Sequence, residues 1–158
     1  MDTSVMFKIG YGLYVLTAKD DAKDNGCIIN TVMQVTSEPL QIAIAVNKKN
    51  YTNEMIQKTK KFNLSILSEN ADFEIYKHFG YQSGREVDKF ASFTEAKRSP
   101  NGVLYVTKGT NAYISAYVQQ EVDLGTHSLF IAQLVAAESL SDDKSATYDY
   151  YQNFVKPK

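Results

Sequence analysis

Alternation of apolar and polar side chains is the feature of this sequence that most limits its fold. Residues 40–47, LQIAIAVN, place Ile42, Ile44 and Val46 on one side of an extended chain, with Ala43 and Ala45 on the other. This repeat is typical of a β-strand, because successive side chains of a strand point to opposite faces. The two alanines leave space beside the sheet, which suits a flat ligand, although a covering helix explains them equally well.

The preceding segment, residues 25–39, has the sequence NGCIINTVMQVTSEP and is predicted to be a strand that leaves a turn. We expect one mostly apolar face and one mostly polar face, formed by Ile29, Thr31, Met33 and Val35 against Asn30, Val32, Gln34 and Thr36. Such a polar face is typical of an antiparallel strand that borders water. It also offers the hydrogen-bonding groups that a polar ligand requires.

Further periodic segments complete the predicted order of elements. Asn25-Gly26 is expected to supply the positive φ angles of a hairpin turn after a strand in residues 11–19. Residues 48–61 and 70–79 have helical spacing, residues 147–158 are expected to add a last helix, and strand alternation occurs in residues 62–68, 103–108, 111–122 and 127–138. The order predicts a mainly β protein, an antiparallel barrel with helices packed outside, since closure removes exposed strand edges.

Composition limits the class of protein. The length of 158 residues fits one domain over residues 1–158, and 17 basic against 18 acidic residues give no field that attracts nucleic acid. Cys27 is the only cysteine, which excludes an internal disulfide and a Cys-x-x-Cys motif. The N-terminus lacks the pattern of a secretory signal and no apolar run approaches the ~20 residues that span a bilayer, so we expect a cytoplasmic protein.

Two polar clusters are candidates for binding a phosphate group. The first lies at the start of a predicted helix, where free backbone N–H groups favour an anion, and contains Lys48, Asn50 and Thr52. The second lies in a predicted loop and contains Ser83, Gly84, Arg85 and Lys89. Taken alone, such lysines are more often solvated surface charges. Together the clusters predict a site for a phosphate monoester.

Other chemistries find little support. The two histidines, His78 and His127, have no partners at metal-ligand spacing, and the chain contains no Gly-x-Ser-x-Gly, glycine-rich dinucleotide or P-loop motif. We interpret His78 as structural. His127 follows a turn that contains a glycine, at the mouth of a predicted strand, where polar side chains can meet a ligand.

Five separated segments resemble the flavin reductase-like family in order and spacing. They are YGLYVLTAK, NGCIINTVMQVTSEP, IAIAVNKKNYT, HFGYQSGREVDKF and EVDLGTHSLFIAQLVAAE, and the resemblance covers about residues 5–140. It is greatest to the subgroup that holds the flavin domain of high-molecular-weight rubredoxins and an archaeal ferric reductase. The resemblance implies the FMN-binding split β-barrel, a Greek-key antiparallel barrel with few flanking helices, and a homodimer with FMN as cofactor and NAD(P)H as co-substrate.

The resemblance also implies a role for individual residues. It places Asn30, Thr31, Gln34 and Thr36 along the edge of the flavin ring or its ribityl chain. The ribityl chain and phosphate are then surrounded by Asn47, Lys48, Asn50, Thr52, Ser83, Gly84, Arg85 and Lys89. His127 falls in the family's Gly-x-His block, beside the flavin face where nicotinamide stacks. One departure is Ala45, since the ferric reductase has a cysteine there.

Three functions remain open at this point. The first is an FMN-dependent oxidoreductase that passes electrons from NAD(P)H to a rubredoxin-like or other redox protein, a ferric complex or free flavin. The second is an FMN electron carrier that a protein partner reduces, without a nicotinamide site of its own. The third, a split-barrel module that has lost flavin, is disfavoured by the polar set between Asn30 and Lys89.

Overall fold

The computed structural model describes residues 1–158 and is dominated by antiparallel strands. The strands are β1 (Tyr14–Lys19), β2 (Asp24–Ile29), β3 (Val32–Ser37), β4 (Leu40–Asn47), β5 (Lys61–Leu67), β6 (Ala96–Arg98), β7 (Leu104–Val106), β8 (Thr110–Asp123) and β9 (His127–Ser139). The helices are α1 (Tyr51–Thr59), α2 (Phe73–Gly80) and α3 (Tyr148–Tyr150), which continues as a π-helical turn over Tyr151–Val155; a 3₁₀ helix covers Thr3–Lys8. We call α3 and its continuation the C-terminal helix.

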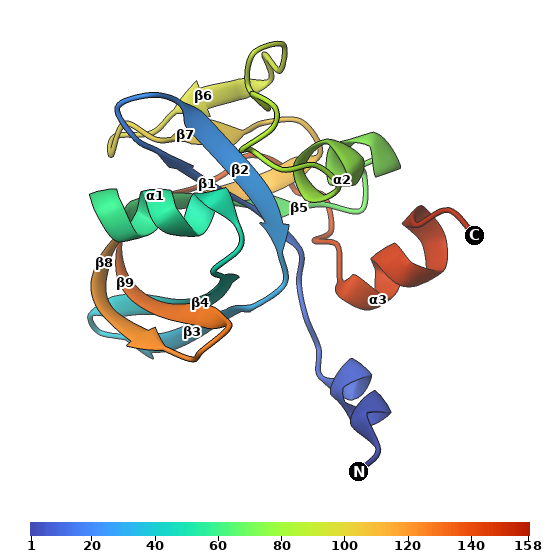
Figure 1. Cartoon of the computed structure of the whole chain (residues 1–158). Coiled ribbons are helices and arrows are strands. Elements are labelled where there is room, and N and C mark those ends of the chain that lie inside the picture. Colours follow the sequence, from blue (N-terminus) through green and yellow to red (C-terminus); the bar gives the residue numbers. More distant parts are fainter.

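One sheet of seven strands forms the body, in the order β2-β1-β5-β8-β9-β4-β3. β2 and β3 lie at opposite edges of this order, yet only Asn30 and Thr31 separate them in the chain. A link this short spans on the order of 10 Å, so the sheet must curl until the end of β2 lies near the start of β3. Figure 1 shows the resulting barrel, with α1 beside its open end. The predicted mainly β barrel is confirmed.

The barrel interior is filled with apolar side chains. Phe62, Leu64 and Phe130 are fully buried there, and α1 adds Met55 and Ile56 from one end. α1 begins where Asn50 accepts a hydrogen bond from the Thr52 backbone N–H, at 3.1 Å, so Asn50 caps the helix. The helix therefore has a fixed start beside β2.

A second apolar cluster covers the outside of β1. Because side chains alternate along β1, Leu16 points into the barrel while Leu13 and Val15 point outward. They pack with Phe79 of α2 and Tyr151 of the C-terminal helix. Helices thus pack outside the barrel, as predicted, and they fix the loop that follows α2.

The hairpin before β2 is confirmed, but the predicted turn residues are wrong. Asn25 and Gly26 lie inside β2, paired with Ala18 and Thr17, and neither has a positive φ angle. The turn is formed around Asp20, whose carboxylate accepts hydrogen bonds from two backbone N–H groups of the turn, at 2.8 and 3.0 Å. An aspartate that bonds to the backbone after it makes a turn without left-handed residues, so Asn-Gly was not needed.

The single strand predicted within residues 25–39 is also wrong. The chain breaks at Asn30–Thr31, β2 and β3 join opposite edges of the sheet, and β3 is exposed along most of its length. Met33 is 62% exposed and Val35 37%, so they form no buried apolar face. An edge strand has a neighbour on one side only, which is why alternation did not predict burial here.

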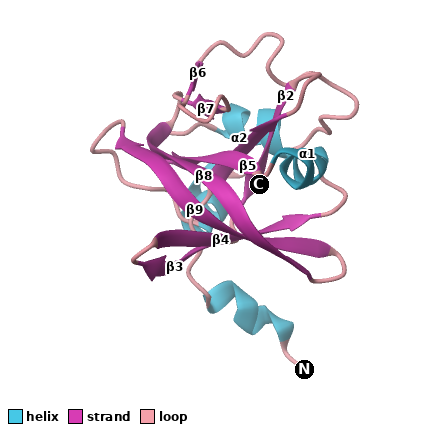
Figure 2. Ribbon diagram, turned by 90° about the vertical axis from the view of Figure 1, so that its left-hand side faces the viewer, coloured by secondary structure: helices cyan, strands magenta, loops and turns pink.

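Two elements were not predicted. The 3₁₀ helix at Thr3–Lys8 buries none of its residues, and Figure 2 shows it extending away from the barrel. β6 has only three residues and pairs with β7 in a hairpin of its own, too short for a periodic pattern. None of the helices has the length and apolar character that a membrane span requires.

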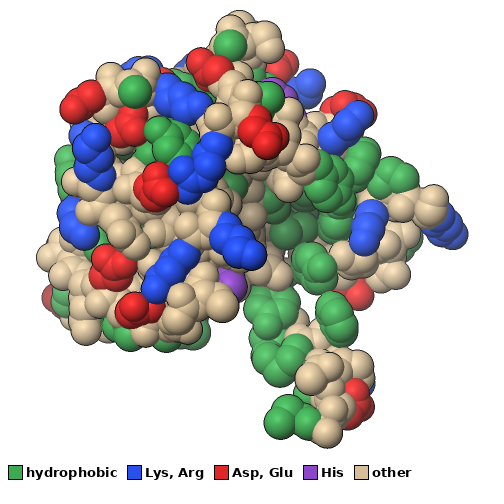
Figure 3. All heavy atoms as spheres, in the orientation of Figure 1, with side chains coloured by type: hydrophobic (Ala, Val, Ile, Leu, Met, Phe, Trp, Pro, Cys, Tyr) green, Lys and Arg blue, Asp and Glu red, His purple; other side chains and the backbone are tan.

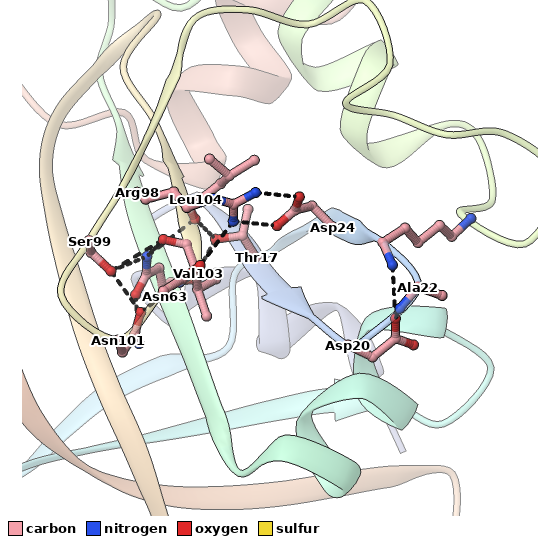
Figure 4. Close-up of polar contacts among 12 residues, drawn as sticks. Thr17, Asp20, Ala22, Asp24, Asn63, Arg98, Ser99, Asn101, Val103 and Leu104 are labelled. Atoms are coloured by element: carbon pink, nitrogen blue, oxygen red, sulfur yellow. Dashed lines mark hydrogen bonds and ion pairs between the residues drawn. The ribbon is translucent and has the colours of Figure 1, made fainter.

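A buried polar network fastens this hairpin to the barrel. Asn63 of β5 donates to the Ser99 hydroxyl and to the Val103 carbonyl, both at 2.8 Å. Its side-chain oxygen accepts from Ser115 at 2.6 Å and from Asn101 at 3.0 Å. Figure 4 shows Asn63 pointing from β5 toward Ser99 and Asn101. The hairpin is therefore held by matched hydrogen bonds in addition to its buried apolar side chain Val106.

Candidate functional site

A cavity of about 400 Å³ lies between β2, the start of α1 and the loop after α2. Its lining residues are Cys27, Ile28, Asn47, Lys49, Asn50, Tyr51, Phe79, Gly80, Tyr81, Gln82, Ser83, Gly84 and Lys89. Asn47, Asn50, Ser83, Gly84 and Lys89 belong to the predicted flavin ligands. Two segments more than 30 residues apart in the sequence are thus brought to one cavity. Figure 3 shows Lys and Arg side chains gathered on the face where α1 begins.

The start of α1 supplies part of the cavity wall. Lys49, Asn50 and Tyr51 line the cavity at the positive end of the helix dipole. Asn50 is held in place because its backbone N–H donates to the Asn47 carbonyl at 3.0 Å and its side chain caps the helix. Backbone N–H groups at a helix start are suited to an anion.

Lys89 is the most informative residue of the cavity. It is only 3% exposed, and its ammonium group donates to the carbonyls of Gly26 and Phe79, at 2.7 and 2.9 Å. It forms no ion pair within the protein, and burial lowers the pKa of its amine. A buried cation without a counter-ion is costly, and an anion in the cavity would remove much of that cost.

Gly84 and Thr52 both lie against Asn25, which the sequence predicted as a turn residue and not as part of the site. Asn25 is buried and its amide donates to the Thr52 hydroxyl at 3.0 Å, while its oxygen has no hydrogen-bond partner. A Cβ atom on Gly84 would lie 2.2 Å from that oxygen. Thr52 itself is fully buried behind the cavity wall. Asn25 and Cys27 are two residues apart in β2, so both face inward. This alternation was the feature of the sequence that could have identified Asn25 as a buried residue.

Two predicted cations are ion-paired at the surface. Arg85 donates to the Glu54 carboxylate through its two terminal guanidinium nitrogens, at 2.6 and 3.2 Å. Its guanidinium group lies 5.1 Å from the centre of the Tyr51 ring. Lys48 contacts Asp123 at 2.5 Å. Neither lines the cavity, although Arg85 packs on Tyr51, which does. The structure therefore places these two charges beside the cavity mouth or outside it.

The predicted ring-edge residues lie apart from the cavity. Asn30 comes two residues after Ile28, the last cavity residue of β2, which is ~7 Å along a strand. Thr31 donates to the Ala45 carbonyl at 2.5 Å, Gln34 to the Thr36 carbonyl at 3.3 Å, and Thr36 to the Pro39 carbonyl at 2.5 Å. The predicted set thus divides into a cavity group and a group that continues along the barrel edge.

The two histidines have different surroundings. His127 begins β9, directly opposite Asn47 of β4, and its Nδ1 lies 2.8 Å from the Thr126 hydroxyl. It is therefore next to a cavity residue but does not line the cavity. His78 stacks on Phe93 and its Nε2 lies 2.6 Å from the Lys89 carbonyl, which agrees with a structural role. No three His, Cys, Asp or Glu side chains are placed to hold a metal ion.

Comparison with known proteins identifies the family. Residues 6–157 match the family model of the flavin reductase like domain. The chain belongs to this family. The predicted family is confirmed. Membership of this family, together with the barrel fold, places the flavin reductase-like protein among flavin-dependent oxidoreductases.

Individual relatives of the flavin reductase-like protein agree. It is 42% identical over 151 residues to a high molecular weight rubredoxin of Moorella thermoacetica, covering 96% of this chain and 66% of that protein. It is 39% identical over 158 residues to a ferric-chelate reductase (NAD(P)H) of Archaeoglobus fulgidus, covering 100% of this chain and 93% of that one. The chain thus spans just under two thirds of the rubredoxin's length.

Solved structures share the fold. The flavin reductase PheA2 superposes with a TM-score of 0.77 at 25% identity, covering 93% of each chain. A flavoredoxin from Methanosarcina acetivorans superposes with a TM-score of 0.75 at 21% identity, covering 87% of this chain and 75% of that one. The split barrel of the flavin reductase-like protein is therefore a fold that flavoproteins share.

Proposed function

We propose that residues 1–158 act as one FMN-binding unit, with the phosphate held between the start of α1 and the loop after α2. The observation that carries this proposal is Lys89, a buried ammonium group that lines the cavity without a counter-ion. We assign five further residues to the binding of this phosphate: Asn47, Asn50, Thr52, Ser83 and Gly84. Lys48 and Arg85 add positive charge from outside the cavity.

The residues present fit a phosphate in three respects. The cavity combines a helix start, a buried cation and a glycine whose missing side chain lets the backbone of the loop pack directly against Asn25. Its lining contains no acidic residue that would repel an anion. Cys27 adds no charge, because burial raises the pKa of its thiol.

The flavin ring is assigned to the barrel edge beyond the cavity. From Ile28 the chain continues to Asn30 and Thr31, and the exposed β3 follows with Gln34 and Thr36. We infer that these four residues hydrogen-bond the ring edge or ribityl chain through side chain or backbone. Bound FMN would supply the electron-transfer chemistry, while the protein binds the cofactor, orients it and limits its contact with water.

We further infer that the electrons come from NAD(P)H and leave to a rubredoxin-type protein, a ferric complex or free flavin. The names of the two relatives support this, since one is a rubredoxin and the other an NAD(P)H-dependent ferric-chelate reductase. The use of NAD(P)H also agrees with a cytoplasmic location. His127, opposite Asn47, is assigned to seating nicotinamide beside the flavin.

One observation favours the second function, an electron carrier without a nicotinamide site. The Nδ1 atom of His127 lies 2.8 Å from the Thr126 hydroxyl, so one of its two ring nitrogens is already engaged within the protein. A carrier would take its electrons from a protein partner. The two functions therefore differ in whether NAD(P)H reduces the bound flavin.

A homodimer is part of the proposal. β3 is an edge strand with exposed Met33 and Val35, and Leu40 at the start of β4 is 43% exposed. Exposed apolar side chains on a strand edge are a surface for association. We assign this surface to contact with a second copy of the chain.

The deciding experiment uses the purified protein. We expect a yellow protein whose released cofactor has the mass of FMN, and whose flavin absorbance bleaches when NADH or NADPH is added anaerobically. Release of FAD alone, or failure to bind any flavin, would contradict the cofactor assignment. Bound FMN that neither nicotinamide bleaches would favour the carrier.

Replacement of His127 separates the two functions further. In His127→Ala we expect FMN to stay bound and reduction by NAD(P)H to slow by ~10- to 100-fold, or roughly 1.4 to 2.7 kcal/mol of transition-state positioning. Stopped-flow absorbance measures the rate, and dithionite reduction serves as the control. Equal rates in variant and wild type would remove His127 from the nicotinamide site.

A further inference from the structure

A second cavity, of about 330 Å³, lies between α2 and the C-terminal helix. Its walls are mainly the rings of Tyr76, Tyr81, Tyr148 and Tyr151. It shares Ile28, Gly80 and Tyr81 with the cavity of about 400 Å³ to which the phosphate is assigned, so the two cavities are neighbours. Figure 3 shows hydrophobic side chains gathered on this side of the molecule. The proposed function assigns no role to this cavity.

The hydroxyl group of Tyr76 has no partner in the protein. Tyr76 is 3% exposed, and its phenol oxygen is buried without a hydrogen bond. An unpaired buried hydroxyl destabilises the folded state, so its retention calls for an explanation. Burial raises the pKa of Tyr76 to about 12, so the group keeps its proton and remains a donor at neutral pH.

The other polar groups of the cavity are mainly donors as well. The hydroxyls of Tyr81 and Tyr151 lie 2.6 Å apart, and whichever accepts this bond keeps its own proton for another acceptor. Gln152 contributes an amide and Lys156 an ammonium group, and no acidic side chain lines the cavity. A matching ligand has a flat apolar body and carries acceptors on its edge.

The cavity is held open by packing around it. The Tyr76 and Tyr151 rings are 4.6 Å apart and tilted, and Tyr81 packs on Phe73 at 5.6 Å. The C-terminal helix is tied to the barrel through the Tyr148 backbone N–H, which donates to the Tyr11 carbonyl at 2.9 Å. Rings fixed in this way present flat faces to a ligand at little entropic cost.

We propose that this tyrosine-lined cavity binds a planar ring that carries carbonyl acceptors, the class of the quinones, as the electron acceptor. The inference rests on the proposed function, because it names an acceptor for the electrons from NAD(P)H. Reduction of a quinone to its hydroquinone takes two electrons and two protons, and NAD(P)H with one proton supplies both. The acceptor site then shares Ile28, Gly80 and Tyr81 with the cavity assigned to the phosphate, and Ile28 leads along the chain toward the residues assigned to the flavin ring.

The test compares two planar six-membered rings with the same four methyl groups, one with carbonyl acceptors and one without. Duroquinone has a fully substituted ring that does not add thiols, and durene is the aromatic ring with hydrogen atoms in place of the two carbonyl oxygens. Isothermal titration calorimetry with the FMN-loaded protein should show tighter binding of duroquinone. Tyr76→Phe should weaken duroquinone binding by about threefold to tenfold, the loss of one hydrogen bond, and leave durene unchanged. Tyr105→Phe, at a tyrosine outside the cavity, is the matched control.

The results separate this inference from the proposed function. Absence of duroquinone binding to an FMN-loaded protein, or equal binding by Tyr76→Phe, would overturn the acceptor site alone. Competition between duroquinone and FMN would also overturn it, because the cavity would then belong to the flavin site. If the protein binds no FMN yet binds duroquinone through Tyr76, the proposed function is wrong, but the tyrosine-lined cavity is still a binding site for a quinone.

Discussion

The contact between Gly84 and Asn25 shows how one absent side chain shapes the proposed phosphate site. A Cβ atom on Gly84 would lie 2.2 Å from the Asn25 oxygen, so Gly84→Ala must displace Asn25 and its bond to Thr52. We expect the free energy of unfolding to fall by about 1 to 3 kcal/mol, the cost of a broken buried hydrogen bond, and FMN affinity to fall because the displaced Asn25 and Thr52 back the proposed phosphate site. Flavin fluorescence titration measures the affinity. Gly10→Ala is the control, since nothing lies within 4 Å of the added atom, and equal affinity in the two variants would contradict this assignment.

If FMN binds with its phosphate beside Lys89, as proposed, its affinity should depend on pH. Burial holds the pKa of its amine below the ordinary value of a lysine. Between these two values the unfolded chain binds the proton and the folded, FMN-free chain releases it, so the free energy of unfolding rises with pH across this window. A bound phosphate favours the charged amine, so FMN affinity should instead fall as pH rises through the same window.

Titrations from about pH 7 to about pH 10 check this effect, because a phosphate monoester is already doubly ionised above its own pKa of about 6. Lys89→Met should bind FMN more weakly and lose the part of the pH dependence that is due to this amine. Lys97→Met, an exposed lysine of β6, should keep the wild-type profile. Identical profiles for wild type and Lys89→Met would exclude Lys89 from phosphate binding.

At the scale of elements, the β6–β7 hairpin offers a comparison between two kinds of attachment. Asn63 holds it through buried bonds to Ser99, Asn101 and Val103, whereas Arg98 holds it through an ion pair with Asp24 at 2.9 Å, with Arg98 48% exposed. Removal of Asn63 leaves several buried polar groups unpaired, while the Arg98–Asp24 pair, although bidentate, is open to water on the arginine side and contributes less.

We therefore expect Asn63→Ala to lower the free energy of unfolding by about 2 to 4 kcal/mol. Arg98→Ala should lower it by less than about 1 kcal/mol. Urea unfolding followed by circular dichroism measures both. Similar losses in the two variants would mean that the network is satisfied by water or that the surface pair matters more than its exposure suggests.

At the scale of the whole molecule, the curled sheet leaves β3 as an exposed edge that bears apolar side chains. If a second copy covers this edge, Met33→Lys should shift the protein from dimer toward monomer, since a charge would be buried without a partner. Analytical ultracentrifugation at several concentrations measures the shift. Leu124→Lys, in the exposed turn between β8 and β9, should leave the dimer unchanged. A wild type that is monomeric throughout would reject the dimer.

Several features followed from the sequence because they depend on near neighbours. Ile42, Ile44 and Val46 face the core as their alternation predicts, and Asn50 caps α1 as its position predicts. The glycine-containing turn that the sequence predicts before His127 is also present, between β8 and β9, and Gly125 has a φ angle of 86° there. Strand faces, helix caps and tight turns are set by a few adjacent residues, so pattern alone predicts them.

Other features were decided only when distant parts of the chain met. The split of residues 25–39 into β2 and β3 follows from closure of the barrel, since the two strands join opposite edges of one sheet. Lys89 appeared in the sequence as one loop lysine among several, and it is buried only because Gly26 and Phe79 supply carbonyls from other elements. Burial and the pairing of charges depend on contacts across the fold, so the sequence identified the types of residue at the site and the tertiary structure decided which of them share one cavity.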